Sequence, residues 1–216
     1  MSHLSFRRHS LSVKPLRLFT MGGSSIIIVS MRIFTGVKLD DEVREHIIKE
    51  LKPFKKVGTT IRWTDSGNIH LTLKFIGAVD EAMTARVAAV LTAANIAVAP
   101  FRLRISGFGK FPAGADLHIF WAGVEECQNL LALFTAIEDA LLPLGIERET
   151  RPFYPHLTLG RNRARYNFKT FFVRLAEKRN HFLAEMQVAA FQLFASHLTA
   201  AGPEYTILKE ISLVQS

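Results

Sequence analysis

The chain of 216 residues contains one cysteine, Cys127. A single cysteine excludes an intramolecular disulfide, and it also excludes a cysteine-rich metal site. Such sparse cysteine usage is compatible with a reducing compartment, so we expect a cytoplasmic protein. Stability must then come from an apolar core, and 49% hydrophobic residues over this length are enough to build a substantial one.

The sequence also lacks a long apolar run. A membrane-spanning helix needs roughly 18 to 20 consecutive apolar residues. The most apolar stretch near the start of the chain, residues 24–31, is much shorter than this. We therefore expect no membrane partner. The chain is basic, with a net charge of +8, which suits a polyanionic partner without identifying one.

Acidic residues are absent from residues 1–30, whose basic residues are Arg7, Arg8, Lys14 and Arg17. A secretory signal would need an apolar stretch of about 7 to 15 residues after the basic start, and Lys14 and Arg17 interrupt that stretch. Two other interpretations stay open. Residues 1–30 form either a flexible basic extension or an addition upstream of a natural start at Met31. In both, the folded domain spans residues 31–216.

Strand patterns and helix patterns follow one another from Met31 onward. Sequence patterns predict strands over residues 31–38, 69–76, 101–107, 117–122, 155–161, 188–197 and 205–212. Helical spacing and capping residues predict helices over residues 40–56, 80–96, 125–144 and 168–179. A turn around Gly202 makes a hairpin of the last two strands. Because hairpin-like neighbours are mixed with helices, we predict an α+β fold.

One tetrapeptide, His-Leu-Thr-Leu, occurs at residues 70–73 and again at residues 156–159. Alternate side chains of a strand share a face, so the histidine and threonine of each copy point one way and the leucines the other. The leucines can anchor each strand in a core while the histidines and threonines line a common cleft. A single copy would more often be a structural polar pair. The third match, His197 and Thr199, lies beside the predicted turn, and we interpret it as structural.

Two histidines and two threonines in one cleft suit the opening of a cyclic phosphodiester by water. This reaction needs a base to take the proton of the water and an acid to protonate the leaving ribose oxygen. Histidine suits both roles because its unperturbed pKa is about 6.5. The threonine hydroxyls can donate hydrogen bonds to the phosphoryl oxygens as charge builds there. This chemistry requires no metal ion, and the sequence suggests no cofactor.

Several ordered motifs support a family resemblance. They are MRIF at residues 31–34, RW at 62–63, NIHLTLKFIG at 68–77, WAGV at 121–124 and RPFYPHLTLGR at 151–161. From Met31 to about Ser212 the chain resembles the two-histidine phosphoesterase superfamily, and within it the bacterial and archaeal RNA 2',3'-cyclic phosphodiesterases, also called 2'-5' RNA ligases. The resemblance implies a bilobal fold with pseudo-two-fold symmetry, in which two antiparallel-sheet lobes with outer helices enclose a central cleft.

The resemblance also implies an activity, the hydrolysis of 2',3'-cyclic phosphate ends to 2'-phosphates. Carried over residue by residue, His70 matches the proton donor and His156 the proton acceptor. Thr72 and Thr158 match the threonines that hold the phosphate. The residue pattern alone does not separate donor from acceptor.

Arg161 is a further candidate for substrate binding. The resemblance places it near the phosphate, whereas strict alternation turns it away from the cleft together with Leu157 and Leu159. A twist at the strand end would redirect it. The family more often has alanine where this chain has Gly160. Arg62 and Trp63 have two open roles, at the cleft rim or in packing.

Three other residues near the two motifs remain candidates. By alternation Lys74 shares the His70 face, where it either steers the anion or is a solvated lysine at the strand end. Phe75 falls on the leucine face by the same rule, which favours core packing over stacking on a base. Tyr154 is a candidate for base stacking.

Three functions stay open on the sequence. The first is metal-independent hydrolysis of 2',3'-cyclic phosphates. The second is 2'-5' RNA ligation by the same site, because microscopic reversibility allows one set of residues to catalyse both directions. The third is a non-catalytic RNA-binding or nucleotide-binding module. We expect RNA ends or small cyclic nucleotides as partners, and a monomer, because two internal lobes complete the site.

Overall fold

The computed structural model describes residues 18–21, 24–27, 30–57, 60–94, 96–111, 119–162, 169–200 and 202–214. The helices are α1 (Asp41–Val57), α2 (Glu81–Ala93), α3 (Gln128–Leu141) and α4 (Lys169–Glu177). The strands are β1 (Leu18–Met21), β2 (Ser24–Ile27), β3 (Met31–Lys38), β4 (Arg62–Trp63), β5 (His70–Val79), β6 (Phe101–Phe111), β7 (Ile119–Val124), β8 (His156–Arg161), β9 (Phe182–Val188), β10 (Ala190–Leu198) and β11 (Pro203–Ser212). Two 3-10 turns, η1 (Ser66–Asn68) and η2 (Leu142–Leu144), complete the set.

One antiparallel sheet forms the centre of the molecule, with the order β11-β10-β3-β5-β8-β7-β6-β9 and with β4 added beside β8. The sheet consists of two four-stranded halves that meet at β5 and β8. These two strands pair at Leu71 and Leu157, the same position of the repeated tetrapeptide. Counted outward from this junction, β3, β10 and β11 correspond to β7, β6 and β9. The fold is therefore α+β and duplicated, as predicted.

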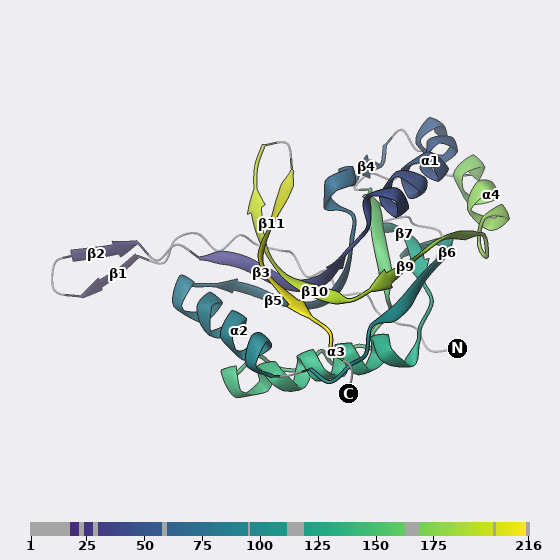
Figure 1. Cartoon of the computed structure of the whole chain (residues 1–216). Helices are drawn as coiled ribbons and strands as arrows, with labels where there is room; N and C mark the ends of the chain where they lie inside the picture. Colours follow the sequence, from purple (N-terminus) through teal and green to yellow (C-terminus); the bar gives the residue numbers. More distant parts are fainter. Residues whose placement is uncertain are drawn as a thin grey trace.

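The helices cross between the halves. Helix α1 connects β3 to β4 and β5, yet it packs against β9 and α4 of the opposite half. Helix α3 connects β7 to β8, and it packs against β5. In Figure 1, α2 and α3 lie below the strands, whereas α1 and α4 lie together at the upper right. Each half of the sheet is thus covered partly by a helix that the other half supplies.

The apolar core lies between these helices and the sheet. Helix α1 contributes Ile47, Leu51 and Phe54, which are all buried. Acidic residues occupy the first turn of α1 and basic residues the last, which complements the helix dipole. The side chain of Asp80 accepts a hydrogen bond of 2.7 Å from the Met83 amide and so begins α2 at the predicted residue.

Strand β9 is the main element that the sequence patterns miss. They predict a single strand over residues 188–197, whereas the structure has β9 ending at Val188 and β10 beginning at Ala190. Leu183 and Ala184 are adjacent and both buried, which obscures the alternation of an ordinary half-exposed strand. Helix α1 covers this strand, so its burial depends on a segment far away in the sequence.

Part of the N-terminal segment forms an antiparallel pair, β1 with β2, which belongs to a separate two-stranded sheet. This pair was not predicted. Residues 1–17, 22–23 and 28–29 of the predicted flexible extension lie outside the described residues. Among the helices of the described part of the chain, none is long and apolar enough to cross a membrane.

Candidate active site

The two repeated tetrapeptides begin β5 and β8, and the pairing of these strands brings them together. Leu71 and Leu157 are opposite each other and fully buried. Continuing this antiparallel register places His70 beside Thr158 and Thr72 beside His156, on the sheet face opposite to the leucines. The pseudo-two-fold axis therefore passes between the two leucines, and it relates one His-x-Thr set to the other.

Both histidine rings are held in the same way. The Nδ1 of His70 lies 2.8 Å from the carbonyl oxygen of Asn68, and the Nδ1 of His156 lies 2.7 Å from the carbonyl oxygen of Tyr154. A carbonyl only accepts hydrogen bonds, so each Nδ1 carries the proton and each neutral ring presents a basic Nε2. The Nε2 of His70 lies 3.0 Å from the Thr72 hydroxyl oxygen.

Burial and positive charge favour the neutral form of both rings. Burial, with the charges of His156 and Arg161 as smaller causes, lowers the pKa of His70 from 6.5 to about 4, although the hydrogen bond to Asn68 opposes the shift. Burial and the charge of Arg161 also lower the pKa of His156, against its hydrogen bond to Tyr154. Because a positive charge on His156 lowers the pKa of His70, protonation of one ring disfavours protonation of the other.

Aromatic side chains produce this burial on both sides. The ring of His70 lies against Phe34, Phe194 and Tyr205, with centroid distances of 4.8, 5.7 and 5.0 Å. The ring of His156 lies 5.3 Å from Phe111. The sequence patterns single out neither Tyr205 nor Asn68. Asn68 could have been found because it precedes His70 by two residues, as Tyr154 precedes His156.

A β-bulge follows each His-x-Thr set. In β5, Thr72 pairs with Gly36 and Lys74 with Thr35, so Leu73 has no partner in β3. In β8, Thr158 pairs with Trp121 and Gly160 with Phe120, so Leu159 has no partner in β7. An extra residue shifts the alternation of all residues that follow it. The strict alternation of side chains assumed from the sequence is therefore wrong beyond Leu73 in β5 and beyond Leu159 in β8.

The bulge in β8 turns Arg161 toward the catalytic face. Arg161 pairs with Ile119, which shares a face with Trp121 and Gly123, the partners of Thr158 and His156. Arg161 is exposed, and its charge lowers the pKa values of His70 and His156. Of the two orientations left open for Arg161, the structure has the one that faces the same side as the histidines.

The bulge in β5 corrects two further expectations. Lys74 leaves the histidine face and lies in the core at 7% exposure. Its Nζ is 2.7 Å from a carboxylate oxygen of Glu138, which is 2% exposed, and it also donates to the carbonyl oxygen of Glu147. Phe75, which alternation placed on the core face, instead lies at the surface. It is 70% exposed and contacts Phe34, which in turn packs on the His70 ring.

Tyr154 is also exposed, at 56%, and its ring packs edge-on against Phe111 beside His156. Phe75 and Tyr154 therefore place two exposed aromatic rings on opposite sides of the histidine pair. Such rings are suited to stacking on nucleobases. Within the described residues, no group of three or more histidine, cysteine, aspartate or glutamate side chains is placed to hold a metal ion.

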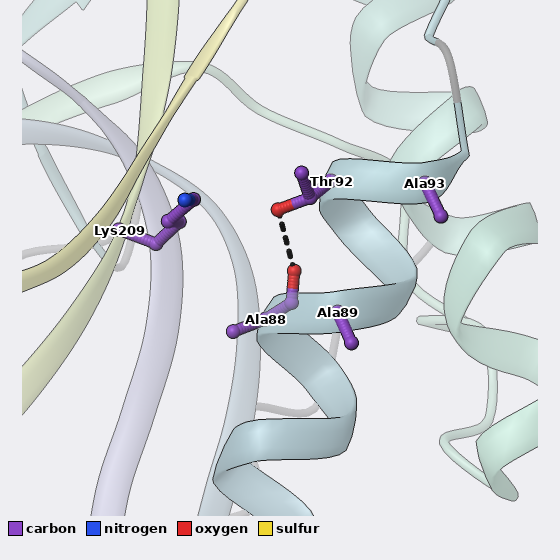
Figure 2. A pocket seen from close by; sticks show the side chains of 5 residues that line it. All are labelled: Ala88, Ala89, Thr92, Ala93 and Lys209. Carbon is purple, nitrogen blue, oxygen red and sulfur yellow. Dashed lines mark hydrogen bonds between the residues drawn. The ribbon is translucent and has the colours of Figure 1, made fainter.

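A separate hollow of about 350 Å³ lies between α2 and β11 (Figure 2). Its walls are Ala88, Ala89, Thr92, Ala93 and Lys209. The Thr92 hydroxyl donates to the Ala88 carbonyl oxygen at 2.8 Å, so the helix itself satisfies this hydroxyl. Four small residues and one lysine offer no acid–base pair, and the face that carries the two histidines remains the candidate active site.

Comparison with known proteins agrees with this geometry. The family model described as "2'-5' RNA ligase superfamily" matches residues 38–199. A protein from Aquifex aeolicus named RNA 2',3'-cyclic phosphodiesterase is 33% identical over 189 residues, which are 85% of this chain and 97% of that protein. A protein of the same name from Archaeoglobus fulgidus is 32% identical over 83% of this chain and 98% of its own length.

Solved structures share the fold. The crystal structure of TT0787 from Thermus thermophilus superposes with a TM-score of 0.70 at 29% identity, and it covers 85% of this chain and 98% of its own. E. coli LigT complexed with 3'-AMP gives a TM-score of 0.70 at 25% identity, over 87% of this chain and all of that one. The family model, the relatives and the fold lead to one conclusion, and the chain belongs to the 2'-5' RNA ligase superfamily of two-histidine phosphoesterases.

Proposed function

We propose that this protein hydrolyses 2',3'-cyclic phosphates at RNA ends or on nucleotides to 2'-phosphomonoesters, without a metal ion. The observation that carries the proposal is the matched pair of histidines, each with Nδ1 held by a backbone carbonyl and each followed by a threonine on the same face. Relatives named RNA 2',3'-cyclic phosphodiesterase over most of the chain support the same activity.

In the proposed reaction His156 is the base and His70 the acid. The Nε2 of neutral His156 takes a proton from water as the water oxygen attacks phosphorus. The Nε2–H of protonated His70 gives its proton to the ribose 3' oxygen as the P–O3' bond breaks. Thr72 and Thr158 donate hydrogen bonds to the phosphoryl oxygens, and the Arg161 guanidinium balances their negative charge. The assignment of acid and base follows the family.

The proposal is tested by incubating the protein with adenosine 2',3'-cyclic phosphate in EDTA and identifying the product. We expect 2'-AMP as the product and a bell-shaped pH dependence of the rate, because one histidine must be neutral and the other protonated. Loss of turnover in chelator would show that a metal ion is needed. Tight binding without turnover would instead support the binding-module alternative.

The pKa of His70 should depend on the ligand. In the free protein it is lowered to about 4, so the ring is neutral at pH 7. A bound phosphate is negative and favours the imidazolium form, so we expect 2'-AMP to raise the pKa of His70 by at least about one unit. NMR titration of the ring protons with and without 2'-AMP measures this shift. An unchanged pKa at saturating ligand would place the phosphate away from His70.

Phe75 should contribute to affinity rather than to stability. We expect Phe75→Ala to weaken binding of 2'-AMP by about tenfold or more, since stacking of a base on an aromatic ring contributes about 1–3 kcal/mol. Its 70% exposure predicts little change in the free energy of unfolding. Calorimetric titration and urea unfolding measure the two quantities, and Val173→Ala on α4, also exposed, is a matched control. A large loss of stability with unchanged affinity would contradict the stacking role.

A further inference from the structure

Two arginines lie directly opposite each other on the strands β4 and β8. Arg62 of β4 pairs with Arg161 of β8 in an antiparallel register, so both side chains leave the sheet on one face. That is the face that carries Thr158 and His156, because the bulge at Leu159 brings Arg161 there. Two arginines on the face that carries the histidines suit a substrate with more than one phosphate.

Strand β4 holds Arg62 firmly in this position. The Thr64 amide donates to the Leu159 carbonyl oxygen at 2.9 Å, which fixes β4 at the bulge itself. Gly160 allows this close approach, because a methyl group on it would lie 2.6 Å from Cγ2 of Ile61. The position of Arg62 relative to Arg161 therefore follows from backbone pairing rather than from a flexible loop.

Arg62 also reaches the opposite half of the sheet. A methyl group added to Gly202, at the tip of the β10–β11 hairpin, would lie 2.9 Å from Nη2 of Arg62. Gly202 has a φ of +140°, which favours glycine for a second reason. The same hairpin tip is tied to the cleft by Asn68, whose side chain donates to the Pro203 carbonyl oxygen at 2.6 Å. Arg62 thus lies close to both halves of the sheet.

We infer that Arg62 binds the phosphodiester that precedes the terminal nucleotide, while Arg161 stays with the reacting phosphate, and that the Arg62 contact makes the enzyme prefer RNA ends to free cyclic mononucleotides. The inference rests on the proposed function and adds the substrate class. A 2',3'-cyclic phosphate occupies the ribose at the end of a strand, so the rest of the strand continues only through the 5' oxygen. The first charge beyond the reacting group is then this internucleotide phosphate, and arginine binds phosphate through paired N–H donors.

The test compares two adenosine dinucleotides that end in a 2',3'-cyclic phosphate. One has an ordinary phosphodiester linkage and the other an uncharged methylphosphonate linkage. We expect kcat/KM of the parent protein to be about tenfold higher or more for the charged linkage, the effect of a hydrogen bond to a charged group. Arg62→Ala and Arg62→Gln should bring the ratio of the two substrates close to one. Arg86→Ala on the exposed face of α2 removes the same charge elsewhere and should keep the parent ratio.

Two results would overturn the inference: a ratio near one in the parent protein, or a parent-like ratio in both Arg62 variants. The comparison of linkages in the parent protein needs no variant, so a variant that fails to fold does not remove the test. If neither dinucleotide is hydrolysed, the proposed function fails. Calorimetry then tests the inference separately, with the same two dinucleotides ending in a 2'-phosphate. The ratio of their affinities replaces the ratio of their kcat/KM values.

Discussion

Replacing either histidine by alanine is expected to reduce kcat for adenosine 2',3'-cyclic phosphate by about 10²- to 10⁴-fold, the usual contribution of a general acid or base. His70→Ala removes the group that protonates the leaving oxygen, and His156→Ala removes the group that takes the proton of water. Both rings project from strands anchored by fully buried leucines, so the sheet should remain intact in either variant. Initial rates in EDTA, with circular dichroism as the check on folding, measure the effect.

The third His-x-Thr match supplies the control for this experiment. His197 is exposed near the end of β10, beside the hairpin that the sequence predicts. His197→Ala should keep the parent rate. If His70→Ala or His156→Ala also kept that rate, the acid–base mechanism would be wrong. Equal losses in all three variants would point to a general effect of replacing histidine by alanine.

The second large effect concerns stability. Lys74→Ala is expected to lower the free energy of unfolding by about 3–5 kcal/mol, because it leaves the buried carboxylate of Glu138 without its cation. Glu138 also accepts a hydrogen bond from the Glu149 amide at 2.8 Å, so its carboxylate cannot easily move out to water. Urea unfolding monitored by fluorescence gives the value.

A double variant tests whether the loss of stability comes from leaving one buried charge of the Lys74–Glu138 pair without its partner. Lys74→Met with Glu138→Gln removes both charges and keeps an acceptor for the Glu149 amide, so it should recover most of the lost stability. The residue pattern alone also allowed Lys74 to steer the substrate anion. That role would be supported if Lys74→Ala raised KM while the free energy of unfolding stayed at the parent value.

The strands and the histidine face could be predicted because they depend on local periodicity. The repeated tetrapeptide fixes which side chains share a face over three residues, and the structure places His70 and Thr72 accordingly. Beyond Leu73 the same rule fails for Lys74 and Phe75, and beyond Leu159 it fails for Arg161. A bulge depends on how a strand fits its neighbour, which short-range sequence patterns do not record.

Other features depend on contacts between distant segments. The burial of Lys74 requires Glu138, which α3 supplies from the other half. Tyr205 reaches the His70 ring only because β10 returns to pair with β3 and β11 pairs with β10. Neither residue shows a local signal of its role. By contrast, the carbonyls that hold the two rings could be anticipated, since each lies two residues before its histidine.

The order of strands also has a consequence for synthesis of the protein on the ribosome. The half that carries His156 is built from one continuous stretch, β6 to β9, whereas the half that carries His70 combines β3 and β5 with β10 and β11 from the end of the chain. The first half can therefore pair its strands before β10 and β11 are synthesised, and the second half must wait for these two strands. Phe194 and Tyr205, which surround His70, emerge at that late stage. A nascent polypeptide with this topology acquires its second imidazole environment only after β10 and β11 have emerged, so a translation product that stops before these strands would be inactive.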